Sequence, residues 1–140
     1  MNWTTWESSI LSLMMWREAR SEGELGMRAV GHVAMNRAIK KALSVAVVVC
    51  QDAQFTSINP YKKTYDPQLD VWPIPGDLTF KLAMRIAYEI VSGLSQDPTH
   101  GADHYWNPLT ATSESFREEV ANGKLVSVAD IGQHQFYKRV

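Results

Sequence analysis

Apolar residues in the first part of the chain recur at the spacing of a helix. From about Thr4 to Ser21 they repeat every three to four positions, which predicts a helix with a wide apolar face. Thr4 and Glu7 have the spacing of a capping box, which marks a helix start. Glu18 follows Met14 by four residues, so it projects from the same apolar face. A carboxylate in that position is unusual.

Two further helical segments follow. Gly23 and Gly26 bracket a turn, and the pattern from Leu25 to Lys41 predicts a second helix. Gly31 lies in its middle, which indicates close approach by another element. Ser44 could cap a short third helix, although the β-branched residues after it equally suit a buried strand.

The middle of the chain lacks a helical period. Residues 52–76 contain four prolines, and a loop of this length in a compact domain is often functional. Asp77 is then predicted to cap the start of a helix that ends at Gly93.

The last third is predicted to be less regular. After a turn-rich stretch over 97–112, Ser115 and Glu118 have a second capping-box spacing and open a short helix. Residues 125–140 alternate around a central glycine, which predicts a hairpin. The pattern predicts one mainly α (α+β) domain over residues 1–140, with a small C-terminal β-hairpin.

Composition narrows the classes of function. Fourteen Lys and Arg residues against 15 Asp and Glu give a net charge of −1, which argues against a nucleic-acid binder. The single cysteine, Cys50, cannot form an intrachain disulfide and suits a reducing compartment. The first residues do not have the pattern of a signal peptide or a membrane span. We therefore expect synthesis in the cytoplasm and no membrane insertion.

Glu18 is the strongest candidate for chemistry. A carboxyl group among apolar neighbours is disfavoured as an anion, so its pKa should rise. A glycosidase needs such an acid, still protonated near neutral pH, to protonate the leaving oxygen. The alternative is a structural glutamate that reaches solvent or pairs with Arg20 or Arg37.

Four sequence blocks, which span most of the chain, bear on this choice. They are Glu18–Glu22 with Gly26 and Ala29–Arg37, then Gln54–Thr56, then Asp97–Ala102 with His104–Pro108, and finally Ile131–Tyr137. In this order they resemble the SleB/CwlJ-type cell-wall hydrolases, which include spore cortex-lytic enzymes and phage and bacterial lysins. Ser21 stands where the family commonly has Gly, and Phe116 where a Trp is usual.

The resemblance implies a lysozyme-like domain of the lytic-transglycosylase type, with Glu18 in the position of the catalytic glutamate. In the implied mechanism Glu18 protonates the oxygen between N-acetylmuramic acid (MurNAc) and N-acetylglucosamine (GlcNAc). It then takes the proton of the muramic C6 hydroxyl as a 1,6-anhydro ring closes; attack by water would make the enzyme a muramidase. No metal or other cofactor is implied. A monomeric phage endolysin, made in the host cytoplasm and released to act on the peptidoglycan glycan strand, fits best.

The later blocks are expected to build a substrate groove, because sugars need aromatic platforms and polar donors. The groove candidates are Glu22, Gln54, Phe55, Thr56, Tyr105, Trp106 and Asn107. Any of the three aromatic residues could instead belong to the core. Glu22 could equally anchor a turn through hydrogen bonds.

Three other functions remain open at this point. His100 and His104 are four residues apart and could share a zinc ion on a helix, as in an N-acetylmuramoyl-L-alanine amidase. The same groove could bind peptidoglycan without cleaving it. The two leading helices could form a helix-turn-helix, although near-zero charge and the apolar second helix argue against DNA binding.

Overall fold

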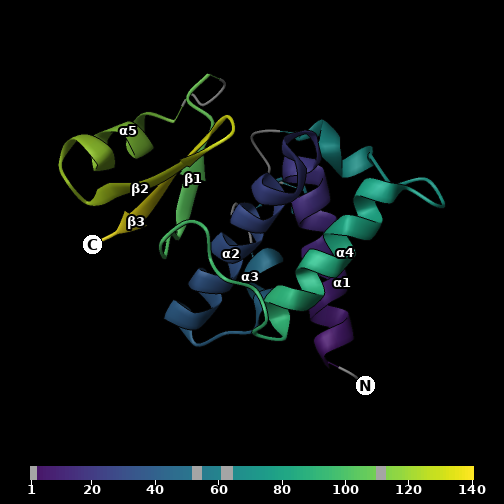
Figure 1. The fold of residues 1–140 in the computed structure, drawn as a ribbon. Helices are drawn as coiled ribbons and strands as arrows, with labels where there is room; N and C mark the ends of the chain where they lie inside the picture. The colour runs from purple at the N-terminus through teal and green to yellow at the C-terminus, as the bar shows by residue number, and fades with distance from the viewer. Residues whose placement is uncertain (1–2, 52–54, 61–64, 110–112) are drawn as a thin grey trace.

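The computed structural model describes residues 3–51, 55–60, 65–109 and 113–140. A body of helices lies beside a small antiparallel sheet that carries one further helix (Figure 1). The helices are α1 (Trp3–Ala19), α2 (Gly23–Lys41), α3 (Val45–Val49), α4 (Leu78–Val91) and α5 (Glu114–Ala121). The strands are β1 (His104–Trp106), β2 (Leu125–Ile131) and β3 (His134–Arg139). The mainly α, α+β class and the C-terminal hairpin are confirmed.

Helix α1 is enclosed by other helices. It packs against α2, α3 and α4, and its buried residues lie on several sides rather than on one stripe. Gly31 of α2 lies where these helices meet, because a Cβ added there would collide with the side chains of Met15 and Ile90. The close approach predicted at Gly31 is therefore confirmed. No helix in the described ranges is both long and apolar enough to cross a bilayer.

Two of the predicted helix starts are confirmed. The Asp77 carboxylate accepts the Phe80 N–H at 2.8 Å and caps α4. The Ser44 hydroxyl accepts the Val47 N–H at 3.2 Å, so the β-branched run after it is a helix and not a strand.

One of the two predicted capping boxes is wrong, and the other depends on the side chain of Thr4, which lies outside the described part of the structure. The Glu7 carboxylate accepts the Val45 N–H at 3.2 Å, so it stabilises the start of α3. The N-cap of helix α5 lies two residues before the predicted one, because the hydroxyl of Ser113, rather than that of Ser115, accepts the Phe116 N–H. Spacing identified both helices, but the choice of hydrogen-bond partner depends on tertiary packing.

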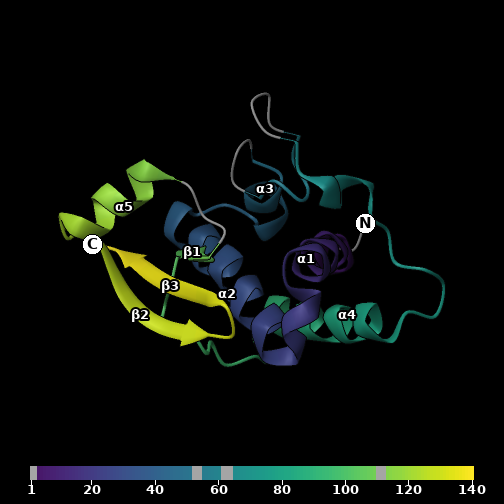
Figure 2. The same cartoon turned by 90° about the horizontal axis from the view of Figure 1, so that it is seen from above.

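The sheet contains a strand that the sequence pattern did not predict. Its order is β1-β3-β2, and Tyr105 of β1 is paired with Phe136 of β3. Since side chains alternate along a strand, Tyr105 and His134 lie on one face of the sheet, whereas Trp106 lies on the other. Helix α2 lies between the sheet and the pair formed by α1 and α4 (Figure 2).

Candidate active site

Glu18 is the last residue but one of α1, where the helix meets the loop that follows α3. The neighbouring Arg17 is buried and ties that loop to the helix end. Its guanidinium donates to the carbonyl oxygens of Ser57 at 2.8 Å and Val71 at 3.0 Å, and more weakly to that of Leu69 at 3.4 Å. Arg17 was not predicted, because its three partners lie 40 to 54 residues away in the chain.

The loop and the sheet enclose the Glu18 carboxyl group. Burial raises its pKa, and the negative charge of Asp66 raises it further. The Ser57 side chain and backbone and the Tyr105 hydroxyl act in the opposite direction. The net result is a raised pKa, so Glu18 keeps its proton to a higher pH than an ordinary carboxylic acid. This is the property a general acid requires.

The Ser57 hydroxyl is buried and lacks a well-formed hydrogen-bond partner among the described residues. It lies close enough to Glu18 to lower the pKa of that carboxyl group. Its interaction is therefore weaker than a full hydrogen bond, and it leaves the effect of burial on Glu18 dominant.

Tyr105 approaches Glu18 from the sheet. Its hydroxyl is enclosed by protein, and burial, followed by the charge of Glu18, raises its pKa well above the usual value. The phenol therefore stays protonated, and its hydroxyl lies close enough to the Glu18 carboxyl group to lower the pKa of that group. Tyr105, a residue of the third block, therefore lies beside Glu18, and its contact with substrate stays a prediction.

Asp66 is a second carboxylate near Glu18 that the sequence analysis did not identify. It precedes a short 3-10 helix (Pro67–Asp70) and accepts the Gln68 N–H at 2.9 Å. It also accepts the hydroxyl of Thr56 at 2.7 Å. Thr56, a predicted groove residue, thus holds Asp66 in place.

Glu22 lies against the turn of the β2–β3 hairpin, at the end of the 3-10 helix Arg20–Glu22. Its carboxylate accepts the Gln133 N–H at 2.7 Å. Its second oxygen lies 2.5 Å from Nδ1 of His134, and both atoms are buried with no other hydrogen-bond partner among the described residues. A Cβ at Gly132 would lie 2.6 Å from the first oxygen, so this contact requires glycine there. Glu22 therefore joins the helical body to the hairpin.

The remaining groove candidates in the described ranges have other contacts. Phe55 is buried, with the Arg37 guanidinium 5.0 Å from its ring centre. Trp106 stacks on Phe116 at 4.6 Å, on the face of the sheet that carries α5. Asn107 accepts the N–H of Leu109 at 2.9 Å in a turn. Gln54 lies outside the described residues, and contact of any of these residues with substrate stays a prediction.

An open pocket gives access to the acid. It has a volume of about 320 Å³ and is lined by Arg17, Glu18, Arg20, Ser21 and Gln68. The Arg17 guanidinium lies 4.5 Å from the ring centre of Trp72, which is 65% exposed. A fixed, exposed aromatic ring of this kind could stack on a sugar.

The two histidines considered as zinc ligands do not share a helix. His100 adopts a left-handed conformation in a turn, whereas His104 lies in β1 and its Nδ1 is 2.8 Å from the Asp103 carboxylate. In the parts of the chain that the structure describes, no three His, Cys, Asp or Glu side chains converge as a metal site would require. The spacing that suggested a metal pair depended on a helix that is not formed.

The fold and the site together define a helical α+β domain with one enclosed, proton-retaining glutamate beside an open pocket. The family described as Cell Wall Hydrolase matches residues 21–137, and the chain belongs to this family. Glu18 lies three residues before the matched segment, at the end of the helix that leads into it. None of the curated proteins matches the sequence.

Solved structures share the fold. The catalytic domain of the germination-specific lytic transglycosylase SleB from Bacillus anthracis has a TM-score of 0.70 and 26% identity, with 94% of this chain and 93% of that chain covered. The catalytic domain of the Bacillus cereus SleB protein has a TM-score of 0.67 and 26% identity, with coverages of 94% and 89%.

Proposed function

We propose that this protein degrades peptidoglycan by cleaving the bond between MurNAc and GlcNAc, with Glu18 as the catalytic acid. Membership of the cell-wall hydrolases supports the substrate class. The likeness to a domain described as a lytic transglycosylase supports the type of reaction. The observation that carries the assignment of Glu18 is its enclosed carboxyl group, with a raised pKa, at the edge of an open pocket.

The chemistry needs one group that first gives and then takes a proton. Protonated Glu18 donates to the glycosidic oxygen, and the bond from that oxygen to muramic C1 breaks. The Tyr105 hydroxyl stabilises the carboxylate that remains. This carboxylate then takes the proton of the C6 hydroxyl while O6 bonds to C1, which closes the 1,6-anhydro ring and restores protonated Glu18.

We favour transglycosylation over hydrolysis because the nucleophile belongs to the substrate. A glycosidase of the usual kind needs a second carboxylate to attack the sugar or to activate water. Asp66 is the carboxylate whose negative charge acts on Glu18, and it already accepts hydrogen bonds from the Thr56 hydroxyl and the Gln68 N–H. It is therefore better suited to adjust the charge around Glu18 than to act as a nucleophile.

We further propose that the protein is a phage endolysin, a monomer made in the cytoplasm and acting on the wall after release. The exposed free thiol of Cys50 suits synthesis in a reducing compartment. Expression in a bacterial host with and without a holin tests this, because lysis should require the holin. Lysis without it would contradict the proposed route of release.

Mass spectrometry of the soluble products from purified peptidoglycan tests the reaction. We expect muropeptides ending in 1,6-anhydro-muramic acid. Reducing muramic ends would instead identify a muramidase that uses the same acid. Intact glycan strands with freed peptides would overturn the proposal and favour an amidase.

A further inference from the structure

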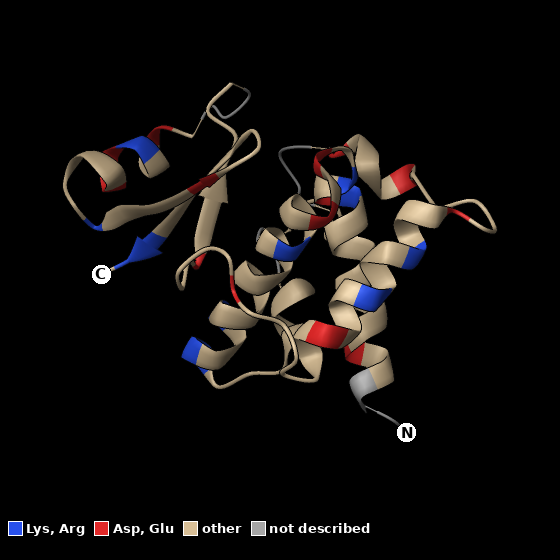
Figure 3. Ribbon diagram, in the orientation of Figure 1, with Lys and Arg blue, Asp and Glu red and all other residues tan. Residues whose placement is uncertain are grey.

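The loop between the 3-10 helix Pro67–Asp70 and α4 presents apolar side chains to solvent. Trp72 is 65% exposed and Ile74 is 72% exposed. Residues 71–76 include no Lys, Arg, Asp or Glu, so this part of the surface is uncharged (Figure 3). Exposed apolar side chains that are grouped in this way are typical of a surface that contacts a ligand or a partner.

Trp72 lies beside the pocket that gives access to Glu18. The link is Arg17, the residue before Glu18 in α1, which lines that pocket. Its guanidinium lies over the Trp72 ring, 4.5 Å from the ring centre, and its Nε donates to the carbonyl oxygen of Val71 at 3.0 Å. Gln68, which also lines the pocket, accepts the Val71 N–H at its carbonyl oxygen at 3.1 Å. Two residues of the pocket wall thus hold the backbone from which Trp72 projects.

The Trp72 ring is held in place by the protein itself. The Arg17 guanidinium beneath it is fixed, because it also donates to the Ser57 carbonyl oxygen at 2.8 Å. Pro73 and Pro75 restrict the backbone that follows, since the proline ring fixes the φ angle. With Arg17 against one face of the ring, the opposite face is the one that a ligand can cover. A platform ordered in advance loses less conformational entropy when a ligand stacks on it.

A sugar ring matches the chemistry of this surface. One side of a pyranose ring presents C–H groups that pack on an aromatic face, and the ring itself carries no charge. The adjacent pocket supplies the amide of Gln68 and the hydroxyl of Ser21, which are polar groups of the kind that sugar hydroxyls need. An aromatic platform beside hydrogen-bonding groups favours a saccharide over a purely apolar ligand.

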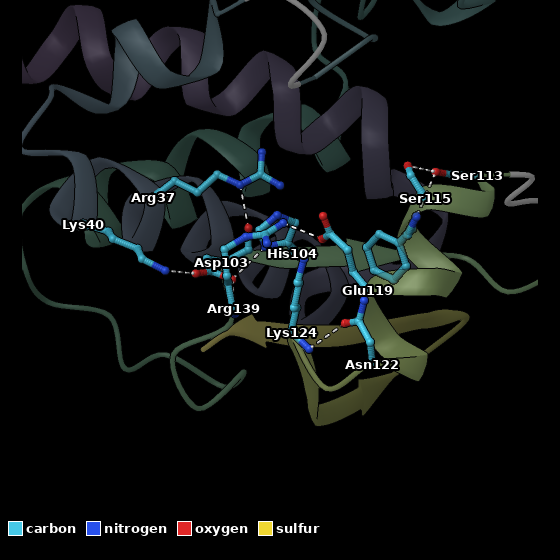
Figure 4. A network of polar contacts seen from close by, with 11 residues as sticks. Arg37, Lys40, Asp103, His104, Ser113, Ser115, Glu119, Asn122, Lys124 and Arg139 are labelled. Atoms are coloured by element: carbon cyan, nitrogen blue, oxygen red, sulfur yellow. Dashed lines mark hydrogen bonds and ion pairs between the residues drawn. The ribbon is translucent and has the colours of Figure 1, made fainter.

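The pocket between the end of α2 and the sheet has a different character. Its lining is mostly charged. The Asp103 carboxylate in that lining already lies 2.9 Å from the Lys40 Nζ and 2.8 Å from the His104 Nδ1 (Figure 4). A sugar gains little by displacing such pairs, so the uncharged surface at Trp72 is the better match for a glycan strand.

We propose that Trp72 is a sugar-binding residue, on which one ring of the glycan strand stacks while the strand also occupies the pocket at Glu18. The proposal rests on the proposed function, because it takes the ligand to be the strand that Glu18 cleaves. Trp72 extends the binding site from the bond that is cleaved to a sugar further along the strand.

Binding is measured with the Glu18→Gln variant, which keeps the strands intact. The ligand is soluble glycan strands from which the peptides have been removed, and strands that keep their peptides are measured beside them. Adding Trp72→Ala should weaken binding to both preparations about tenfold, whereas Trp72→Phe should stay within about threefold of the parent. Trp6→Ala, at a 50% exposed tryptophan of α1, is the matched control and should change the dissociation constant by less than about twofold.

Tryptophan fluorescence reports the contact itself. Peptide-free strands should change the emission of the Trp6→Phe protein as they change that of the parent. The Trp72→Phe protein should lose most of this change, because the ring that meets the sugar is absent. An unchanged fluorescence response in Trp72→Phe would overturn the proposal.

The binding result and the cleavage result are separable. Equal affinity of the Trp72→Ala and parent proteins for peptide-free strands would overturn the stacking and leave the proposed cleavage standing. A loss confined to strands with peptides would also overturn it, since the ring would then contact the peptide. An equal loss in Trp6→Ala would contradict a specific role of Trp72. Product analysis of the wild-type protein is run separately, so a failure of the proposed cleavage is recognised independently of binding.

Discussion

The Tyr105 hydroxyl lies close enough to the Glu18 carboxyl group to lower its pKa, although the two residues lie in different parts of the fold. Tyr105 is the middle residue of β1, and Glu18 lies near the end of α1. His134 packs edge-on against the Tyr105 ring at 5.1 Å and contacts Glu22. The hairpin thus fixes the position of the phenol, and through it the environment of the acid.

Tyr105→Phe should shift the pH dependence of cleavage upward. The hydroxyl lowers the pKa of Glu18, so its removal raises that pKa and moves the alkaline loss of activity to a higher pH. The rate should fall roughly 10- to 100-fold, because the carboxylate formed during reaction loses a donor. A pH–rate profile on soluble strands measures both effects. An unchanged alkaline limb would show that the hydroxyl does not act on Glu18.

Asp66→Asn should move the alkaline loss of cleavage activity to a lower pH. The Asp66 charge raises the pKa of Glu18, so a neutral amide lowers it and activity is lost at a lower pH. The amide oxygen can still accept the Gln68 N–H and cap the 3-10 helix, and the amide nitrogen can donate to the Thr56 hydroxyl in place of the lost oxygen. Asp70→Asn, on the exposed end of the same helix, is the charge-matched control. A shift of equal size in both variants would contradict a specific action of Asp66.

Arg17→Lys should loosen the loop over the acid. A lysine cannot make the forked contacts to three carbonyl groups, and the buried Ser57 oxygen would lose its donor. We expect the free energy of unfolding to fall by about 2 kcal/mol. Faster hydrogen exchange should be confined to the loop around Ser57 and Val71. Arg85→Lys, at an exposed pair with Glu24, should change stability by less than about 0.5 kcal/mol.

Glu18→Gln should stabilise the protein at neutral pH. The folded protein holds the Glu18 proton more tightly than the unfolded chain, whose carboxyl pKa is near 4.5. Stability therefore falls as pH rises from that value through the raised folded pKa, and the variant escapes this loss. Thermal unfolding at several pH values should show a small difference below pH 4.5 and a gain of a few degrees near pH 8. A gain that does not vary with pH would contradict the raised pKa.

Much of the fold could be predicted from local pattern. The helices carrying Asp77 and Ser44 were identified because periodicity and a capping side chain lie within a few residues of each other. The strand β1 was missed because it is three residues long and follows a turn-rich stretch. Recognising it would have shown that Tyr105 and Trp106 point to opposite faces.

The buried position of Glu18 was predictable, and most of its surroundings were not. Glu18 interrupts an apolar face, which is a local signal that the sequence blocks around it strengthened. Arg17, Ser57 and Asp66 carry no such signal, since their roles depend on how the loop after α3 packs against the end of α1. Long-range loop packing of this kind is decided by tertiary contacts and not by spacing.

The rate of glycan cleavage by Glu18→Gln tests the central claim most directly. Released strand ends are counted for the wild type and the variant on the same soluble peptidoglycan, with folding checked by circular dichroism. A folded variant should be slower by about 1,000-fold or more, because it has no proton to donate. A folded variant that cleaves within about tenfold of the wild-type rate would show that Glu18 is not the catalytic acid.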